Sequence, residues 1–211
     1  VMRILLTGAT GFIGRNLKEA WEARHELYAP PSRELDLLDQ QAVENCLLDR
    51  RFDVVVHAAN TNNVIHPERA PEQVERNLRM FLNLRRCSAL YGRLYYFGSG
   101  AEYDIRHAIP RMPEAYFGRH VPGDAYGFSK YTMSLLADGN IFDLRLFGVF
   151  GKYEEWTRRF ISNMIWQGMS GGTMTMRQNR RFDYLYIDDL VRIMDWFLTH
   201  EPQHHHYNVC T

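Results

Sequence analysis

Hydrophobic residues in this chain recur in two kinds of segment: short uninterrupted runs, and longer stretches with a single apolar face. The short runs are rich in aliphatic and aromatic residues and end at Gly, Pro or a charged residue, as buried strands do. Runs that are apolar at successive positions are typical of parallel strands that are covered on both faces. The pattern predicts five strands, at residues 3–7, 25–29, 53–57, 94–97 and 142–146.

Between these runs the apolar residues follow a helical period. One helix is predicted over residues 12–23, and a second begins after Asp39, whose carboxylate suits a helix N-cap. A third helix covers residues 71–92, with Pro71 in a first turn that tolerates proline, and a fourth begins at Asp124. Because strands and helices alternate, we predict an α/β fold with a doubly wound, Rossmann-type parallel sheet.

The last sixty residues follow a less regular pattern. They predict a helix over 155–168, strands over 173–176 and 183–187, a helix from Asp188 to Leu198 and a final strand over 207–210.

Composition excludes several classes of function. The 211 residues carry 25 Lys and Arg against 25 Asp and Glu, so no basic face for nucleic acid or an anionic membrane is expected. No apolar run approaches the roughly 20 residues of a membrane span, and the N-terminus lacks a signal-peptide layout. The three scattered cysteines predict free thiols in a reducing cytoplasm. The run His204–His206 is interpreted as a solvated turn, so no metal is expected.

A glycine-rich turn, TGATGFIG at residues 7–14, follows the first predicted strand. Gly8 permits a tight turn, Gly11 lets the backbone approach a pyrophosphate, and Gly14 lets helix and strand pack closely. The helix N-terminus offers free N–H groups and the positive end of its dipole to the anion. We therefore predict dinucleotide binding through Gly8, Thr10, Gly11, Phe12, Ile13 and Gly14.

Tyr126 and Lys130 stand four residues apart on a predicted helix, so their side chains share one face. A phenol is a poor base at neutral pH, and a nearby ammonium favours its ionised form, so the pair could exchange a proton with a substrate. Taken alone, the spacing Y-x-x-x-K also fits a surface lysine beside a packed tyrosine.

The glycine turn and the tyrosine–lysine pair together resemble the extended short-chain dehydrogenases/reductases, the NAD-dependent epimerase/dehydratase family that modifies nucleotide sugars. The resemblance extends from residue 2 to residue 210. It implies that Ser99, which follows the fourth strand, binds the reacting sugar oxygen and that Lys130 also holds the nicotinamide ribose. The implied catalytic residues are Ser99, Tyr126 and Lys130.

The same resemblance implies an organisation and an assembly. Residues 1–150 would form the NAD(P)-binding domain, and residues 151–211 a small substrate-binding part, interleaved with the first, that looks truncated. The interval 130–145 is short as well. Family members pair two helices of each subunit in a four-helix bundle, so we expect a homodimer through residues 71–91 and 124–138.

Several other positions resemble residues that line the cofactor in this family. Asp36 also has a second interpretation as a helix-capping residue. Arg145 and residues 183–190 match late signatures of the family. The positions implied for the cofactor are Asp36 and Leu37 beside the adenine, Ala58, Ala59 and Asn60 beside the phosphates and ribose, and Asn77 in support of the site's backbone.

The choice between NAD and NADP depends on the end of the second predicted strand. A carboxylate there would accept the ribose 2′-hydroxyl and repel a 2′-phosphate, and this chain has none. Ser32 and Arg33 could bind a phosphate, which favours NADP. Arg33 is equally compatible with a solvated charge, so NAD stays open.

Departures from the family pattern narrow the expected reaction. The dehydratases carry an Asp-Glu pair where this chain has Gly100-Ala101, so 4,6-dehydration is not expected. The second and third strands resemble GDP-fucose synthases, but the cysteine and histidine used for epimerisation there are replaced at Ala101 and near Arg159. What remains is a nucleotide-sugar 4-epimerase or 4-keto reductase. The alternatives are a cofactor-sensing regulator and a reductase of a non-sugar carbonyl.

The substrate side is defined less sharply. Gly148 stands where relatives often have an asparagine and so removes a polar contact. Arg159 and Arg181, with neighbouring arginines at 158, 177 and 180, could clamp a diphosphate or be ordinary surface residues. The expected substrate-binding residues are Ser99, Gly100, Ala101, Gly148, Arg159 and Arg181.

Overall fold

A six-stranded, wholly parallel sheet forms the centre of the protein in a computed structural model that describes residues 1–61, 71–176, 178–179 and 181–211. Its strand order is β2-β1-β3-β4-β5-β8, so the predicted doubly wound parallel sheet is confirmed. The strands are β1 (Arg3–Thr7), β2 (Glu26–Tyr28), β3 (Val54–His57), β4 (Arg93–Ser99), β5 (Ile141–Leu146) and β8 (His206–Val209).

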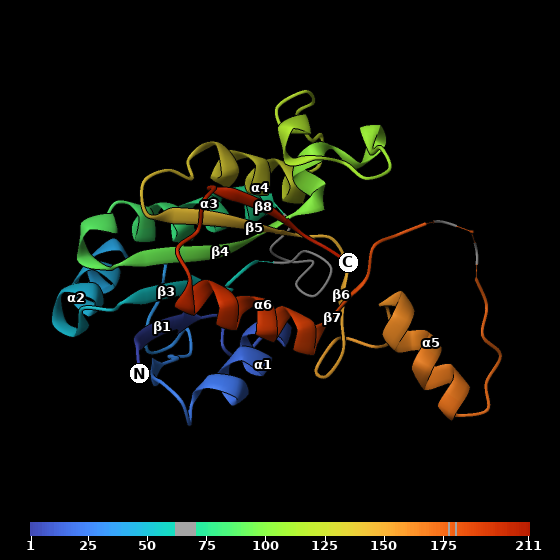
Figure 1. Ribbon diagram of the computed structural model, residues 1–211, viewed down its shortest axis with the longest axis horizontal. Helices are drawn as coiled ribbons and strands as arrows, with labels where there is room; N and C mark the ends of the chain where they lie inside the picture. The colour runs from blue at the N-terminus through green and yellow to red at the C-terminus, as the bar shows by residue number, and fades with distance from the viewer. Residues whose placement is uncertain (62–70, 177, 180) are drawn as a thin grey trace.

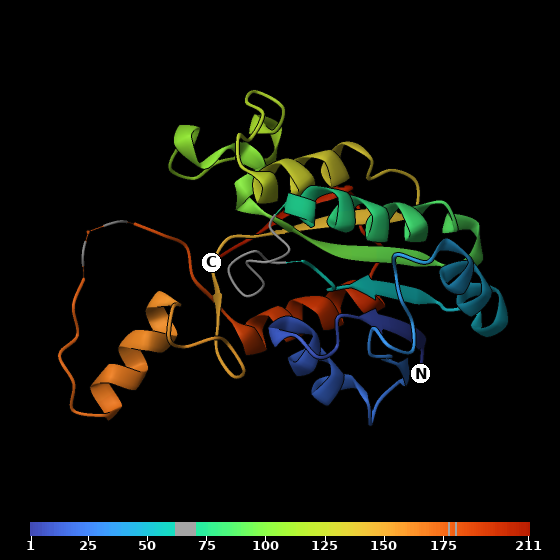
Figure 2. The same cartoon turned by 180° about the vertical axis from the view of Figure 1, so that it is seen from behind.

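Helices cover both faces of this sheet, as Figures 1 and 2 show. On one face lie α1 (Phe12–Trp21) and α6 (Ile187–Thr199). The other face carries α2 (Gln40–Arg50), α3 (Gln73–Arg85) and α4 (Ala125–Leu135).

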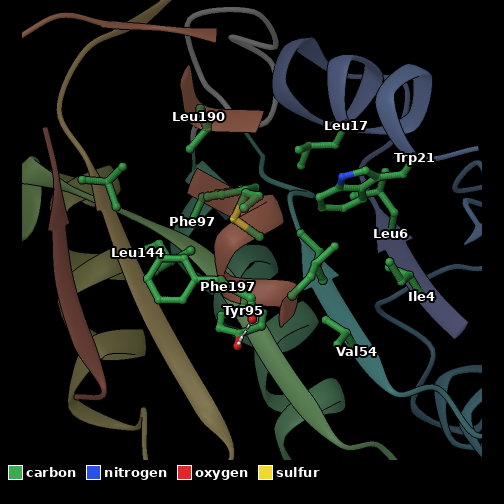
Figure 3. Packing of buried hydrophobic residues seen from close by; sticks show 14 of the residues in the cluster. Ile4, Leu6, Leu17, Trp21, Val54, Tyr95, Phe97, Leu144, Leu190 and Phe197 are labelled. Atoms are coloured by element: carbon green, nitrogen blue, oxygen red, sulfur yellow. Dashed lines mark hydrogen bonds between the residues drawn. The ribbon is translucent and has the colours of Figure 1, made fainter. Parts of the chain in front are cut away.

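Alternate residues of the strands pack against these two helical layers, because successive side chains of a strand point to opposite faces. Ile4 and Leu6 pack with Leu17 and Trp21 of α1 in one core, whereas Leu5 belongs to the other. Figure 3 shows the first core, where the Tyr95 hydroxyl also donates to the carbonyl of Phe197 in α6. Both faces of the sheet are thus buried, which explains the uninterrupted apolar runs.

Two of the predicted helix starts have the expected N-cap. Asp39 accepts hydrogen bonds from the N–H groups of Gln41 and Ala42 at the start of α2. Asp124 accepts from the N–H of Gly127 at the start of α4. Because these caps satisfy N–H groups that have no partner within the helix, they fix where each helix begins.

The third predicted helix is shorter in the structure. A turn at residues 71–72 precedes α3, which ends at Arg85 and not at Gly92, and a separate 3₁₀ turn, η2 (Ser88–Leu90), follows. Three more short turns fill the connection between β4 and α4: η3 (Gly100–Tyr103), η4 (Ile105–His107) and η5 (Glu114–Tyr116).

The C-terminal part differs most from expectation. Helix α5 (Phe160–Met169) begins five residues later than predicted and stands apart from the sheet in both views. The strand predicted at 173–176 is wrong, because those residues are irregular and exposed. A small two-stranded sheet forms instead from β6 (Val149–Phe150), which was not predicted, and β7 (Leu185–Tyr186).

The chain then returns to the main sheet through α6 and β8. The segment after residue 150 therefore supplies a projecting part, helix α6 and the last strand of the main sheet (Figure 1). Among the described residues, no helix combines the length and the apolar character needed to cross a bilayer.

Candidate functional site

The glycine turn lies at the point where the strand order reverses, since β1 has β2 on one side and β3 on the other. In open parallel sheets, ligands bind outside the carboxyl ends of the strands at such a point. Gly8 has φ +71°, a conformation that glycine adopts without strain. A Cβ on Gly14 would clash with the carbonyl oxygen of Gly8, so helix α1 can pack this closely only because residue 14 is glycine.

The start of α1 suits an anionic group. Its N-cap is Gly11, which is exposed and has no side chain to cap the first N–H groups. The nearest atom to a Cβ at Gly11 is the Gly8 carbonyl oxygen at 3.4 Å, so the turn itself leaves this position open. Phe12 and Ile13, but not the exposed Thr10, line the adjoining cavity. The turn therefore fits a pyrophosphate approaching along the backbone.

A cavity of about 580 Å³ adjoins this turn and the ends of β3 and β4. Its wall brings together residues that are far apart in the sequence. Some were expected to bind the cofactor, others to bind the substrate or to act in catalysis. These shared residues are Phe12, Ile13, Ala58, Ala59, Asn60, Ser99, Tyr126, Lys130, Gly148 and Arg159.

His57, at the end of β3, also lines this cavity, although its sequence pattern gave no sign of it. Its Nδ1 lies 2.8 Å from the hydroxyl oxygen of Thr7, the neighbouring residue of β1. Burial, reinforced by the charge of Lys130, lowers the pKa of His57 to about 3. The imidazole is therefore neutral at physiological pH and serves to join the two strand ends.

Ser99, Tyr126 and Lys130 come together at the end of β4 and the start of α4. The Ser99 hydroxyl oxygen accepts the N–H of Ala101 at 3.1 Å, which fixes the turn after the strand. Burial raises the pKa of the Tyr126 phenol above its usual 10, and a hydrogen bond with Ser99 partly opposes this effect. The phenol is therefore protonated at neutral pH.

Lys130 is anchored to the backbone of the neighbouring strand β4. Its Nζ donates to the carbonyl oxygen of Phe97 at 2.8 Å and lies 5.9 Å from the centre of the Tyr126 ring. Burial lowers the pKa of Lys130 to about 8, against the opposing charges of Glu102 and Asp143. Burial of the phenol is the largest influence on the pKa of Tyr126 in this structure.

Asn77 holds the backbone beyond β3, as the resemblance implied. Its Oδ1 accepts the N–H of Thr61 at 2.7 Å, and its Nδ2 donates to the carbonyl of the same residue. Gln73, one turn earlier on α3, donates to that carbonyl as well. Three hydrogen bonds from α3 thus fix the chain just after Asn60.

The remaining cofactor positions lie outside the cavity wall. Ser32 and Arg33 are exposed in the turn after β2, where they could meet the far end of a dinucleotide. Asp36 accepts the N–H of Leu38 at 2.9 Å in the turn before α2, whose N-cap is Asp39 and not Asp36. Leu37 is buried in the core beneath α2 and α3.

The substrate side is built from glycine and aromatic residues. A Cβ on Gly148 would lie 2.7 Å from both the Asp183 carbonyl and the Phe182 ring, so a larger side chain has no room there. A Cβ on Gly100 would likewise lie 2.6 Å from the ring of Phe147. This packing explains why the polar residue expected at position 148 is absent.

Several further wall residues come from the segment between β5 and α6: Phe147, Phe150, Glu154, Arg158, Phe160, Ile161, Phe182 and Tyr184. Arg159 is the N-cap of α5 and lines the cavity, whereas Ala101 and the exposed Arg181 do not. Positions 177 and 180 lie outside the described residues. Where the structure describes the chain, no group of three or more His, Cys, Asp or Glu side chains could hold a metal ion.

Comparison with known families places this geometry in context. The model of the NAD dependent epimerase/dehydratase family matches residues 4–210. A GDP-L-colitose synthase from Yersinia pseudotuberculosis is 33% identical over 86 residues, 39% of this chain and 28% of that protein. A GDP-L-fucose synthase from Azorhizobium caulinodans is 41% identical over 69 residues, 30% of this chain and 21% of that protein. The matched segments thus span less than a third of these relatives.

Solved structures share the fold over almost the whole chain. The Bordetella bronchiseptica enzyme WbmG, in complex with NAD and UDP, has a TM-score of 0.80 at 22% identity, covering 99% of this chain and 72% of that one. A GDP-L-fucose synthetase from Naegleria fowleri bound to NADP has a TM-score of 0.81 at 16% identity, covering 99% and 76%.

Lys130 offers a direct test of the site's electrostatics, because the chain has only two other lysines, Lys18 and Lys152. We expect the Nζ of Lys130 to titrate near pH 8 in an NMR titration of labelled lysine side chains, and its signal to be missing in Lys130→Met. The unfolded chain binds this proton more tightly, so the lysine's contribution to stability should rise between pH 8 and 10.5. A midpoint near 10.5 would contradict the buried position.

Proposed function

The chain belongs to the NAD dependent epimerase/dehydratase family, and on that premise we propose that it is an NAD(P)-dependent enzyme acting at C4 of a nucleotide sugar. The reaction is either 4-epimerisation or reduction of a 4-keto group. The observation that carries the proposal is the single cavity that Ser99, Tyr126 and Lys130 share with Phe12 and Ile13 of the glycine turn. Cofactor and sugar can therefore meet beside the phenol.

Each side chain has a defined task in this proposal. The Ser99 hydroxyl orients the C4 oxygen, and the Tyr126 phenol exchanges a proton with it. A bound nicotinamide would supply or take the hydride. Because burial keeps Tyr126 protonated, the site is prepared to donate a proton to an oxygen that becomes negative. This supports reduction of a keto group as the favoured direction.

Lys130 binds the nicotinamide ribose in this proposal, after leaving the carbonyl of Phe97. The neutral His57 and the alanines after β3 supply an uncharged wall beside it. Ser32 and Arg33 support NADP over NAD, because both are exposed in the turn after β2 and residues 28–33 include no Asp or Glu. A cytoplasmic location would supply both cofactor and sugar nucleotide.

A guanosine diphosphate sugar is the substrate class that we propose, since two curated relatives are named for GDP-linked sugars. Arg159, at the start of α5, would bind the diphosphate, with a helix N-terminus beside it. The aromatic residues around the cavity, among them Phe160 and Tyr184, would exclude water from the sugar.

Replacing the phenol tests the proposed chemistry. Tyr126→Phe should reduce the rate of NADPH oxidation with a GDP-linked 4-keto sugar by at least about a hundredfold, the usual contribution of a positioned acid. The dissociation constant for NADPH, measured by fluorescence, should change less than about threefold. Turnover close to that of the wild-type protein would refute the assignment of Tyr126.

Gly11→Val tests the cofactor site. The position has space within the fold, so the melting temperature should stay within a few degrees, but the side chain would occupy the approach of the pyrophosphate. We expect at least about a tenfold loss of affinity in parallel titrations with NADPH and NADH. Tighter binding of NADPH by the wild-type protein supports the NADP proposal, and undiminished affinity in the variant would place the phosphates elsewhere.

A homodimer through α3 and α4 is part of the proposal. These helices lie side by side, and α4 presents the exposed side chains of Phe128 and Leu135. Light scattering should give about twice the chain mass of 24.9 kDa, and Leu135→Glu should give a monomer. The matched control is Leu48→Glu on α2, which should leave the mass unchanged. A wild-type monomer would contradict the proposal.

A further inference from the structure

A buried ionic cluster lies directly beneath the turn that carries Ser99. The guanidinium of Arg145 donates through Nε to Glu102 Oε2 at 2.8 Å and to Asp143 Oδ2 at 3.0 Å. All three side chains are fully buried. Two carboxylates against one guanidinium would leave an excess negative charge in the core, which is costly without compensation.

The second oxygens of the two carboxyl groups meet at Gly98 of β4. A Cβ on that residue would clash with both Glu102 Oε1 and Asp143 Oδ1, so the absence of a side chain makes room for the pair. Asp143 Oδ1 is buried and lacks a hydrogen-bond partner among the described residues. A proton on Glu102 would supply that partner and remove the excess charge.

Glu102 connects this cluster to the candidate site. Its Oε1 accepts the backbone N–H of Ser99 at 2.8 Å, while the Ser99 hydroxyl accepts the N–H of Ala101. The two residues thus form a capping box at the start of η3. Any change in the Glu102 carboxyl is transmitted to Ser99 through one hydrogen bond.

We propose that Glu102 is a positioning residue that shares one buried proton with Asp143 and thereby holds Ser99 in place beside Tyr126. The inference rests on the proposed function only in that Ser99 acts on the substrate oxygen. Neither carboxyl touches the substrate, and the proton does not take part in the reaction. The proton leaves the carboxyl pair with a single negative charge. That charge balances the charge of Arg145, so that Glu102 stays ordered.

The electrostatic surroundings support this assignment. Burial, followed by the charge of Asp143, raises the pKa of Glu102 well above its usual range, and Arg145 opposes the shift only in part. The other titratable or charged groups around the pair come from four elements: Tyr96 of β4, Tyr103 of η3, Tyr126 and Lys130 of α4, and His206 of β8.

Glu102→Gln separates the positioning role from folding. The amide has nearly the same shape, but it cannot accept from both Ser99 and Arg145 and also donate to Asp143 Oδ1. Keeping the charged arginine contact would therefore release the Ser99 N–H. We expect kcat to fall at least tenfold, with an unchanged circular dichroism spectrum and unchanged affinity for NADPH. The matched control is Glu22→Gln, at an exposed glutamate after α1, with wild-type kcat.

A double-mutant cycle with Ser99→Ala identifies the route. If Glu102 acts through Ser99, the double variant should be no slower than Ser99→Ala alone. Losses that multiply in the double variant would overturn the inference while leaving the role of Ser99 intact. A fully active Ser99→Ala protein would instead refute the proposed function, so the two failures are distinguishable.

The shared proton can be tested by measuring how the stability of the protein depends on pH, which requires no measurement of enzyme turnover. A carboxyl whose pKa is raised by folding stabilises the protein below the unfolded pKa of about 4.5, and that contribution is lost as the pH rises toward the folded pKa. The unfolding constant should therefore increase by up to about tenfold per pH unit above 5. Asp143→Asn supplies an N–H in place of the proton, so the unfolding constant of this variant should depend less steeply on pH.

Both proteins in this comparison carry His206→Gln, which removes the imidazole that lies 3.4 Å from Asp143 Oδ2, so that no imidazole contacts the carboxyl pair. The difference between the two proteins in urea unfolding between pH 5 and 8 then measures the pH dependence that the carboxyl pair contributes, because all other groups are common to both. Equal slopes in the two proteins would overturn the shared proton.

Discussion

The parallel register of β1, β3 and β4 brings the polar groups at the carboxyl ends of these strands to one edge of the sheet, and the rest of the site is built around that edge. Thr7 is paired with His57, and His57 with Tyr96, so these strands reach the same edge of the sheet together. The hydrogen-bonding distance between the side chains of Thr7 and His57 joins the first two strands at that edge. Because parallel strands present their carboxyl ends on one side, the glycine turn, the segment after β3 and Ser99 open into the same cavity. A shift of one residue in this register would turn the His57 side chain to the opposite face.

Space at this edge comes from missing side chains. Gly14 lets α1 approach the turn after β1, Gly98 leaves room for two carboxyl groups, and Gly148 makes way for the ring of Phe182. A Cβ added at any of these three positions would lie within 3 Å of a neighbouring atom, although none of the three glycines has a positive φ. These positions therefore require glycine for close packing and not for an unusual backbone conformation. In the same way, the glycine at position 148 reflects aromatic packing that no local sequence pattern could reveal.

Local patterns predicted the centre of the main sheet because strands β1, β3, β4 and β5 are almost wholly buried, and burial on both faces produces an uninterrupted apolar run in the sequence. Cap residues such as Asp39 act over two or three positions, so helix starts could be predicted as well. The projecting part around α5 lacks this signal, since none of that helix's residues is buried and its apolar side chains do not mark a core face. The ionic cluster escaped prediction for another reason: Glu102 and Arg145 are 43 residues apart and meet only through the pairing of β4 with β5.

The charges around the candidate site are balanced in a way that favours one direction of proton transfer. Burial lowers the pKa of Lys130 to about 8, although the charges of Glu102 and Asp143 act in the opposite direction. A negative charge on Glu102 also raises the pKa of Tyr126 and so keeps the phenol protonated. If the carboxyl pair carries one proton, its charge cancels that of Arg145, and the phenol is governed by burial and by Ser99. A protonated phenol held by an ordered serine can donate at once to an oxygen that gains negative charge, whereas abstraction of a proton would first require the burial cost to be overcome. An enclosed site with a neutral ionic cluster and a protonated phenol therefore fits the carbonyl reduction that we propose better than it fits oxidation of an alcohol.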